Sequence, residues 1–389
     1  MKSLLRVGSS ALLAGVLLFA TAGIAMATGT QEAPADEIVI GFFGPLSGEN
    51  AQYGRNFRNA IELYTDAVNE AGGINGLPVR VIYEDDRADP REAANIAQRY
   101  ASDRSVIATI GSFSTAAAMA AAPVLEETGL VQISPTSSHP DFTLQGEYMF
   151  RIVTTQDIEA PLGARFVRDR LQAQRIALIY RQDDWGVVVN EHFARSVQEL
   201  DADLVLREAV VPATRDFRPL VTRLGELQPD ALYLALFYAD AAVLAQQMDQ
   251  AGLDIPVVTN TSLYNPQLIE LAGEAVDGYY VPSNFAPQDP APVVTTFVTG
   301  YEERFGSAPD QFAALAYDAI GSLVTALESV SRDGSVPSRA DVRDALAAMD
   351  RYTGVTGELE FDEHGNALRT DMTWLRIEDG RFRVLEEEE

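Results

Sequence analysis

Short apolar runs rich in β-forming residues alternate along the chain with amphipathic stretches of helical periodicity. In the first part of the chain the apolar runs do not alternate with polar residues, which is typical of strands buried on both faces. The apolar runs are IVIGFF (38–43), LPVRVIYEDD (77–86), VIATIG (106–111) and GLVQIS (129–134). Between them, helices are predicted at about 56–71, at 90–101 and, as an Ala-rich segment, from near Thr115. This order predicts a parallel sheet covered by helices.

The same rhythm returns after residues 150–160. RIALIYRQDD (175–184) is followed by a helix through Glu199, and further on ALYLALFY (231–238), a helix through Ala251 and IPVVTN (255–260) continue the pattern. The repetition predicts two similar doubly wound lobes, and 389 residues are too many for one ordinary core.

The rhythm changes after GYYVPSNFAP. A long helical section (294–330) and a further helix (338–349) are predicted there. The segments GELEFDEHGN and MTWLRIEDGRFRVL alternate in polarity around turn residues, which predicts short antiparallel strands near the C-terminus.

The N-terminus has the features of a signal peptide. Lys2 and Arg6 precede the apolar run ALLAGVLLFATAGIAMA, which ends in Ala25-Met26-Ala27, a cleavage signature. We expect residues 1–27 to be removed and the mature protein to be periplasmic, although the length of the run leaves an uncleaved anchor open. No other run is expected to span a membrane.

Composition excludes several kinds of chemistry. The chain has no cysteine, so disulfides, thiol nucleophiles, cysteine metal sites and a lipid-anchored cysteine are excluded. Its only lysine is Lys2, which removes P-loop and Schiff-base chemistry from the mature protein. Without the signal peptide the chain contains 27 basic and 57 acidic residues, which gives a net charge of −30. Such a charge disfavours binding to nucleic acid and to anionic lipid. Two explanations of the acidic composition are consistent with the sequence: adaptation to high salt, and an exported protein that is simply acidic.

Loops at the carboxyl ends of the predicted strands are rich in hydroxyl, amide and aromatic side chains. In open parallel sheets these loops form the ligand crevice. In GSFSTA, Ser114 and Thr115 stand where a strand gives way to a helix, which fits either helix capping or a small-anion site. Nothing demands catalysis, since His139, His192 and His364 are scattered, and no metal or cofactor motif is present.

Several of these motifs resemble those of a known family. IVIGFFGPLSGENAQYGRN, AGGINGLPVRVIYEDDRADP, IGSFSTAAAMAAAPVLEETGLVQISPTSSHPDF and ALIYRQDDWG resemble the branched-chain amino acid binding proteins of bacterial ABC transporters, which are type I periplasmic binding proteins. The resemblance implies an α/β fold of two Rossmann-like lobes with parallel central sheets, joined by three crossover strands near 153–156, 281–284 and 356–359. It also implies lobe 1 at 38–154 plus 285–356 and lobe 2 at 156–282 plus 357–385, with ligand held between them.

The resemblance also implies a ligand site. Thr115 and Ser138 would donate hydroxyl hydrogen bonds to the ligand carboxylate, and backbone N–H groups near Ser114 and Thr136 would complete the anion site. Aromatic walls around the ligand tail would come from Tyr53, from Trp185 and from Phe237 or Tyr238. Thr261 lies in a further loop of the crevice.

The sequence departs from the family pattern at one place. The amino acid binders carry an acid for the ligand ammonium in the loop after the strand that matches IPVVTN, but here residues 259–263 contain no carboxylate. Either Asp240, Asp184 or Asp157 takes over this role, or the ligand has no ammonium, because a buried unpaired ammonium is costly.

These features together predict a solute-binding protein rather than an enzyme. We expect a monomer that delivers a branched-chain or other hydrophobic amino acid to an ABC permease. The alternatives are a binding protein for an aromatic or short-chain carboxylic acid or amide, and a ligand sensor that signals to a membrane receptor.

Overall fold

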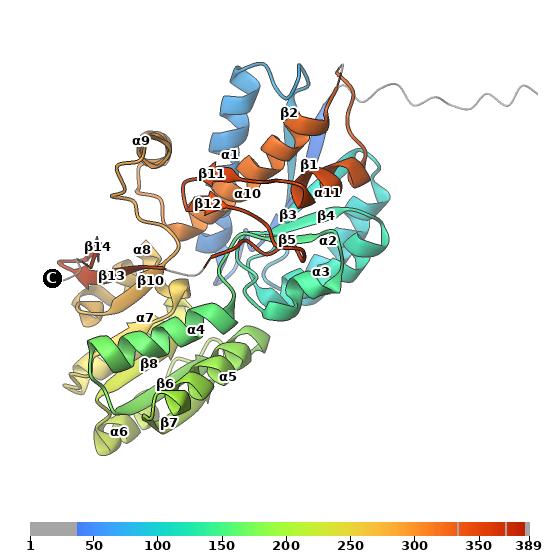
Figure 1. Cartoon of the computed structure of the whole chain (residues 1–389). Coiled ribbons are helices and arrows are strands. Elements are labelled where there is room, and N and C mark those ends of the chain that lie inside the picture. Colours follow the sequence, from blue (N-terminus) through green and yellow to red (C-terminus); the bar gives the residue numbers. More distant parts are fainter. Residues whose placement is uncertain (1–36, 333, 370–371, 386–389) are drawn as a thin grey trace, which may run out of the picture. The chain divides into compact units, whose positions relative to one another are not determined.

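Two sheets form the framework of the protein (Figure 1). The computed structural model describes residues 37–332, 334–369 and 372–385. The predicted signal peptide, residues 1–27, lies outside the described residues. The first sheet has the order β2-β1-β3-β4-β5 and is parallel throughout. Its strands are β1 (Ile38–Gly44), β2 (Val79–Asp85), β3 (Val106–Gly111), β4 (Val131–Ser134) and β5 (Met149–Arg151).

Helices alternate with these strands as the apolar runs predicted. Every residue of β1 and β3 is buried, which explains why their sequences do not alternate between apolar and polar. The intervening helices are α1 (Ala51–Glu70), α2 (Pro90–Ser102) and α3 (Thr115–Glu127), and the 3₁₀ turn η1 (Pro140–Gln145) follows β4.

The second sheet has the order β14-β13-β10-β9-β8-β6-β7. Strands β7, β6, β8, β9 and β10 are parallel, whereas β13 and β14 are antiparallel additions at one edge. The strands are β6 (Arg175–Arg181), β7 (Asp203–Val210), β8 (Ala231–Ala235), β9 (Val257–Thr259), β10 (Tyr280–Ser283), β13 (Thr373–Glu378) and β14 (Arg381–Val384). The accompanying helices are α4 (Gln156–Arg165), α5 (Asp184–Glu199), α6 (Arg218–Leu227), α7 (Tyr238–Gln250) and α8 (Pro266–Ala272), with the short helical turns η2 (Phe166–Arg170), η3 (Thr261–Leu263) and η4 (Gly273–Val276).

The chain passes between the two sheets three times. It leaves the first sheet after β5 and returns after β10, where α9 (Pro292–Phe305), α10 (Gln311–Val330) and α11 (Arg339–Ala347) follow. Helix α10 packs against α1. A small hairpin of β11 (Tyr352–Gly354) and β12 (Gly357–Leu359) comes next, and the chain then rejoins the second sheet at β13. The predicted fold class is confirmed, while the residue boundaries of the two lobes stay a prediction.

Two helices differ from their predicted extents. Helix α1 begins at Ala51, well before the predicted start at Asn56. Gly54 had the character of a loop residue, but its lack of a side chain lets the helix lie against the carbonyl of Pro45, which a Cβ would approach within 2.1 Å. The predicted helical section 294–330 is two helices, because Gly306 ends α9 in the left-handed conformation and Asp310 caps the start of α10.

Helix α10 also corrects the expectation that no other run could span a membrane. By length and composition it is apolar enough to do so, but 72% of its most apolar window is buried inside the protein. Such burial identifies the helix as a core element packed against α1 and α11.

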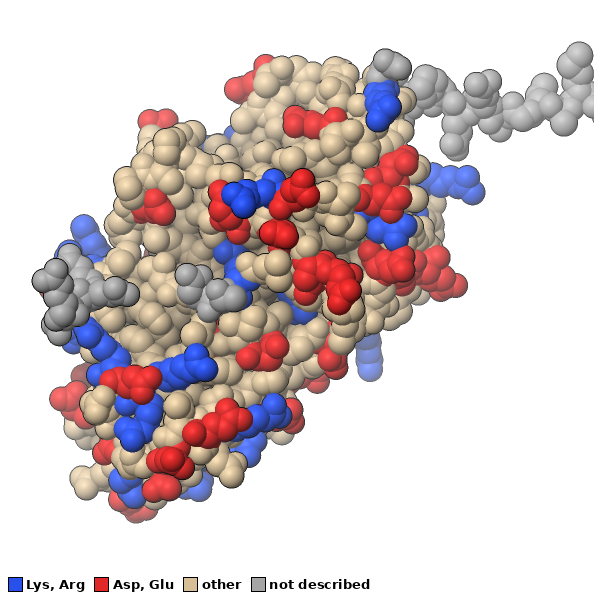
Figure 2. Space-filling view, viewed as in Figure 1, with Lys and Arg blue, Asp and Glu red and all other residues tan. Residues whose placement is uncertain are grey.

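Charged side chains are spread over the surface shown in Figure 2, where arginines lie among the aspartates and glutamates. Several of them form ion pairs between solvent-accessible groups, such as Arg304–Asp66 at 2.6 Å and Arg223–Glu208 at 2.8 Å. Exposed pairs of this kind contribute little stability individually.

Candidate functional site

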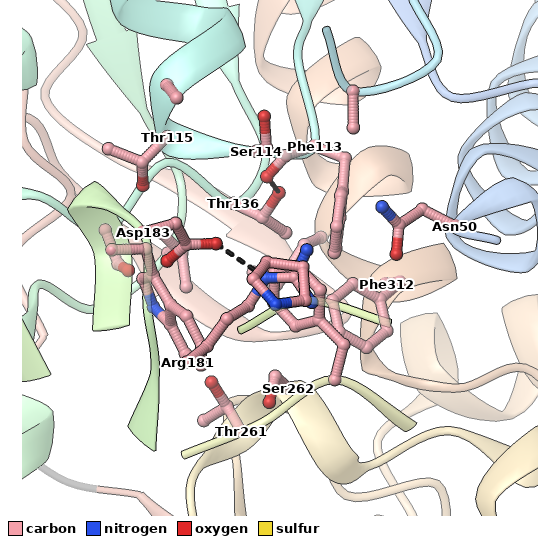
Figure 3. Close-up of a pocket in the computed structure, with 18 of the residues that line it drawn as sticks. Asn50, Phe113, Ser114, Thr115, Thr136, Arg181, Asp183, Thr261, Ser262 and Phe312 are labelled. Carbon is pink, nitrogen blue, oxygen red and sulfur yellow. Dashed lines mark hydrogen bonds and ion pairs between the residues drawn. The ribbon is translucent and has the colours of Figure 1, made fainter. Parts of the chain in front are cut away.

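A cavity of about 370 Å³ is lined by residues from both halves of the fold (Figure 3). Its walls come from the carboxyl ends of β3, β4, β6, β8 and β9 and from the start of α10. This placement follows the rule for open parallel sheets. The polar and aromatic lining residues are Asn50, Arg87, Phe113, Ser114, Thr115, Thr136, Ser138, Arg181, Asp183, Trp185, Phe237, Thr261, Ser262, Gln311 and Phe312.

Hydroxyl side chains from the β3 and β4 loops form one wall. Ser114 caps α3, since its hydroxyl accepts a hydrogen bond from the Ala117 N–H at 3.2 Å. Thr136 donates to the Phe113 carbonyl at 2.9 Å, and Ser138 accepts from the Gln156 amide at 3.1 Å. The Thr115 hydroxyl makes no hydrogen bond to any described residue. Ser114 therefore caps helix α3, and Thr115 lines the cavity at the N-terminus of the same helix with a hydroxyl that has no partner among the described residues.

A buried carboxylate holds the loop that carries these hydroxyls. Asp86 is fully buried and accepts a hydrogen bond from the Ser112 hydroxyl at 2.5 Å and from the Ala88 N–H at 2.8 Å. Burial raises the pKa of Asp86 to about 6. Ser112, the first hydroxyl residue of the loop, therefore has a structural role beneath the cavity wall.

Aromatic rings form the apolar part of the lining. Trp185 and Phe237 stack with centroids 5.1 Å apart, and Phe113 lies 5.1 Å from Phe237. Phe312, at the start of α10, completes this part of the wall. Rings in such arrangements bury much apolar area and select flat or compact ligand bodies.

Tyr53 and Tyr238, both predicted to face the ligand, are not among the residues that line the cavity. Tyr53 is fully buried behind Phe113, on which it stacks at 4.1 Å. Its hydroxyl donates to the Ser262 carbonyl at 3.1 Å and accepts from the Tyr238 N–H at 3.3 Å. The Tyr238 hydroxyl donates to the Glu49 carbonyl at 2.6 Å. These two tyrosines connect the two halves of the fold beside the cavity.

Thr261 and Ser262 line the cavity from the second half of the fold. The buried Glu159 is hydrogen-bonded to Thr261. Glu159 accepts hydrogen bonds from the Thr261 N–H at 2.7 Å, from the Thr261 hydroxyl at 3.2 Å and from the Gln156 amide at 2.7 Å. Burial raises the pKa of Glu159. Glu159 was not predicted as a site residue, because a single glutamate carries no signal of burial in the sequence.

Arg181 is a lining residue that was not predicted from the sequence. It ends β6, and its Nε donates to Asp183 at 2.6 Å while Nη1 donates to Asp240 at 3.1 Å. The guanidinium carbon lies 4.4 Å from the centre of the Phe237 ring. The segment ALIYRQDDWG carries part of the family resemblance, which implied Trp185 as a wall of the site but not Arg181.

None of the three predicted ammonium partners is among the lining residues. Asp240 is buried and held by Arg181, with Arg215 at 3.6 Å, and burial raises its pKa. Asp184 and Asp157 are exposed residues in the first turns of α5 and α4. Asp183 lines the cavity instead, where it accepts from Arg181 and caps α5 through the Gly186 N–H at 2.9 Å.

Comparison with known proteins places the chain in a family. The model of the periplasmic binding protein family matches residues 37–381. The Leu/Ile/Val-binding protein homolog 1 of Brucella abortus is 26% identical, and the match covers 90% of this chain and 94% of that protein. A protein of Rhodospirillum rubrum described as a branched-chain amino acid ABC transporter is 35% identical, with a TM-score of 0.68, covering 90% of this chain and all of that one.

A leucine-binding protein from Thermotoga maritima agrees in fold more closely. Its TM-score is 0.83 at 26% identity, and the match covers 90% of this chain and 98% of that chain. These relatives are substrate-binding proteins, in agreement with a cavity built from parallel-strand ends in two sheets. The chain belongs to the periplasmic binding protein family and is a solute-binding protein of the ABC-transporter type.

Proposed function

We propose that this protein binds a small carboxylate-bearing ligand between its two halves and delivers it to an ABC permease after removal of residues 1–27. The free Thr115 hydroxyl at the N-terminus of α3, on the wall of the cavity, is the observation that carries the proposal. Unpaired N–H groups and the positive end of the helix dipole favour an anion at this place.

The rest of the lining fits a ligand with one anionic end and an apolar body. Ser138 and Thr136 stand beside Thr115 as further hydroxyls, and Trp185 and Phe237 supply aromatic surface. A volume of about 370 Å³ is near the lower end of the usual range for small-molecule sites, roughly 300–1,000 Å³.

The names of the relatives favour a hydrophobic amino acid as the ligand. A second candidate, a carboxylic acid without an ammonium group, is favoured by the cavity lining. Asp183 is the only lining carboxylate among the described residues, and it is already paired with Arg181. Both candidates share the carboxylate, and they differ in the ammonium group that an α-amino acid carries on the carbon next to it.

Delivery requires the two halves to close on the ligand. Thr115 and Ser138 belong to the first sheet and its helices, whereas Trp185, Phe237 and Thr261 follow strands of the second. A ligand that contacts both groups binds the closed arrangement more tightly and shifts the equilibrium toward it. The closed form then presents one surface to a permease.

Thermal unfolding in the presence of matched acids and amides tests the proposal. Ligand at 100 times its dissociation constant stabilises the folded state by about 2.7 kcal/mol, a measurable rise in melting temperature. A panel of hydrophobic amino acids and amine-free acids should contain at least one stabilising carboxylate whose amide gives no shift. Equal shifts from acid and amide, or no shift from any carboxylate, would contradict the proposal.

A further inference from the structure

Arg151, the last residue of β5, is a buried cation whose hydrogen-bond partners are all uncharged. The residue is 1% exposed, and no carboxylate in the described part of the chain forms an ion pair with it. Its guanidinium makes five hydrogen bonds, as many as it has N–H groups. The acceptors are the carbonyls of Ser137, His139 and Pro140, the Thr143 hydroxyl and the Asn366 side chain. Burial lowers the pKa of Arg151 to about 10, so the guanidinium stays charged at neutral pH, and charge-assisted hydrogen bonds are stronger than neutral ones.

Three of these acceptors belong to the loop that follows β4 and carries Ser138. Nη1 donates to the carbonyls of Ser137 at 3.1 Å and His139 at 2.5 Å, which lie on either side of Ser138. The peptide bond between Ser137 and Ser138 is trans, and in a trans peptide the carbonyl and the next N–H point in opposite directions. The Ser138 N–H therefore points away from the guanidinium, and Arg151 fixes the orientation of the loop from behind.

Ser138 brings two unused donors to the wall of the cavity. Its N–H has no acceptor among the residues that the structure describes. Its hydroxyl oxygen accepts from the Gln156 amide at 3.1 Å, which leaves the hydroxyl proton free. Ser138 is 3% exposed, so bulk water reaches little of it. Buried donors without acceptors are unfavourable, and a ligand carboxylate in the cavity would supply the missing acceptors.

We infer that Arg151 is a positioning residue of the ligand site, which holds the N–H and the hydroxyl of Ser138 in place to donate to the ligand carboxylate. This inference rests on the proposed function, since it takes a carboxylate to bind in the cavity. Arg151 is not among the lining residues, so it acts through the loop and not by contact with the ligand. Arginine suits this role, because its planar fork can hold several carbonyls at fixed angles.

Arg151→Lys tests the role of the guanidinium, because lysine keeps the charge but has fewer donors and no planar fork. Calorimetry on the mature protein uses leucine and desamino-leucine, which share a carboxylate and differ in the ammonium. Where neither binds, the carboxylate with the largest shift in the thermal panel takes their place. We expect affinity for the carboxylate to fall about 10-fold or more in Arg151→Lys.

Arg339→Lys is the matched control for loss of an arginine that holds backbone carbonyls. The Arg339 guanidinium donates to the carbonyls of Val106 at 3.0 Å and Asp103 at 2.9 Å. Val106 begins β3, whereas the cavity lies beyond the other end of this strand. Arg339→Lys should lower the free energy of unfolding and leave ligand affinity unchanged. A purely structural role of Arg151 would give the same result in Arg151→Lys.

A double-mutant cycle tests whether Arg151 acts through Ser138. Ser138→Ala should weaken binding about 10-fold in the wild type but no more than about twofold in Arg151→Lys, where the loop is already displaced. Thr115→Val, on the loop after β3, should weaken binding by the same factor in both backgrounds. In the wild type, nuclear magnetic resonance should show the Ser138 amide proton moving downfield when the carboxylate binds, as expected for a new hydrogen bond.

The outcomes separate this inference from the proposed function. Unchanged affinity in Arg151→Lys, equal effects of Ser138→Ala in both backgrounds, or an unmoved Ser138 amide signal would overturn the role of Arg151 while a carboxylate still binds. If Arg151→Lys does not fold, the amide signal of the wild type decides. Failure of every carboxylate in the thermal panel would instead contradict the proposed function, and the inference would fall with it.

Discussion

The Thr115 hydroxyl is the residue-scale feature on which the carboxylate site depends. Replacing it with valine keeps the shape of the side chain but removes the donor, so Thr115→Val should weaken ligand binding by about 1–3 kcal/mol. Isothermal calorimetry measures this directly. Thr128→Val is the matched control, because Thr128 lies at the opposite end of α3 and its hydroxyl donates only to carbonyls of that helix. Unchanged affinity in Thr115→Val would remove this residue from the site.

Asp310 gives a pH dependence with a defined sign. It is buried, caps α10 through the Ala313 N–H, and accepts from the amides of Asn56 and Asn265. Burial raises the pKa of Asp310 to about 7, whereas an unfolded aspartate titrates near 3.9. The folded state therefore holds the proton more tightly, and this stabilisation is complete below about pH 4 and is lost as the pH rises through about 7.

Chemical denaturation between pH 5 and 8 tests this sign. The free energy of unfolding should fall as the pH rises, and Asp310→Asn, which can still cap the helix, should reduce the slope. Asp86 and Asp318 have pKa values raised to about 6 and act in the same direction, so part of the slope remains. The same slope in Asp310→Asn as in the wild type would show that Asp310 does not titrate in this range.

At the residue scale the sequence predicted the polar wall better than the residues behind it. Ser114 and Thr115 could be found because hydroxyls where a strand gives way to a helix are a local pattern, whereas Thr136 and Ser138 came from the family resemblance. Arg181 and Glu159 could not, because their importance comes from the direction of one side chain and the burial of another. Those properties depend on tertiary packing, which a single sequence does not display.

At the scale of elements, the junction of β6 and α5 positions Arg181 and Trp185. A methyl group at Gly186 would lie 1.9 Å from the carbonyl oxygen of Arg181. Gly186→Ala must therefore displace the start of α5 from the end of β6. We expect the free energy of unfolding to fall by about 1–3 kcal/mol, and ligand affinity to fall as well.

Gly300→Ala is the matched control for this substitution. It lies within α9, where an added methyl group would meet Leu63 at 3.8 Å, an ordinary contact. Alanine should stabilise this helix by about 0.5–1 kcal/mol. Denaturation of both variants measures the contrast, and a Gly186→Ala protein as stable as the wild type would contradict the tight junction.

The order of strands and helices could be predicted because buried parallel strands appear in the sequence as continuous apolar runs. The start of α1 could not be predicted in this way, because the close approach of Gly54 to the Pro45 backbone, which only a residue without a side chain permits, is a tertiary contact. The C-terminal strands were predicted as antiparallel, but their partners were not: β12 pairs with β11, and β13 pairs with β10 and β14. Pairing between distant segments leaves no local signal.

At the scale of the whole molecule, the two lobes followed from the repetition of the pattern, whereas the crossovers between them came only from the family resemblance. The three passages between the sheets are long-range features of topology. No residue near 153–156 or 281–284 marks them in the sequence, so their positions could not be derived from composition or periodicity.

The net charge of −30 expected for the mature protein makes a prediction for the molecule as a whole. Self-repulsion among exposed carboxylates destabilises the compact state at low ionic strength, and salt screens it. If the surface is adapted to high salt, the free energy of unfolding should rise from low to molar NaCl. Urea denaturation across this range measures the effect, and a flat profile would contradict adaptation to salt.

The crystal structure of the mature protein with its tightest-binding acid tests the central claim most directly. The account predicts the ligand carboxylate within hydrogen-bond distance of the Thr115 hydroxyl at the N-terminus of α3. A ligand outside this cavity, or one whose carboxylate lies away from Thr115, would contradict it.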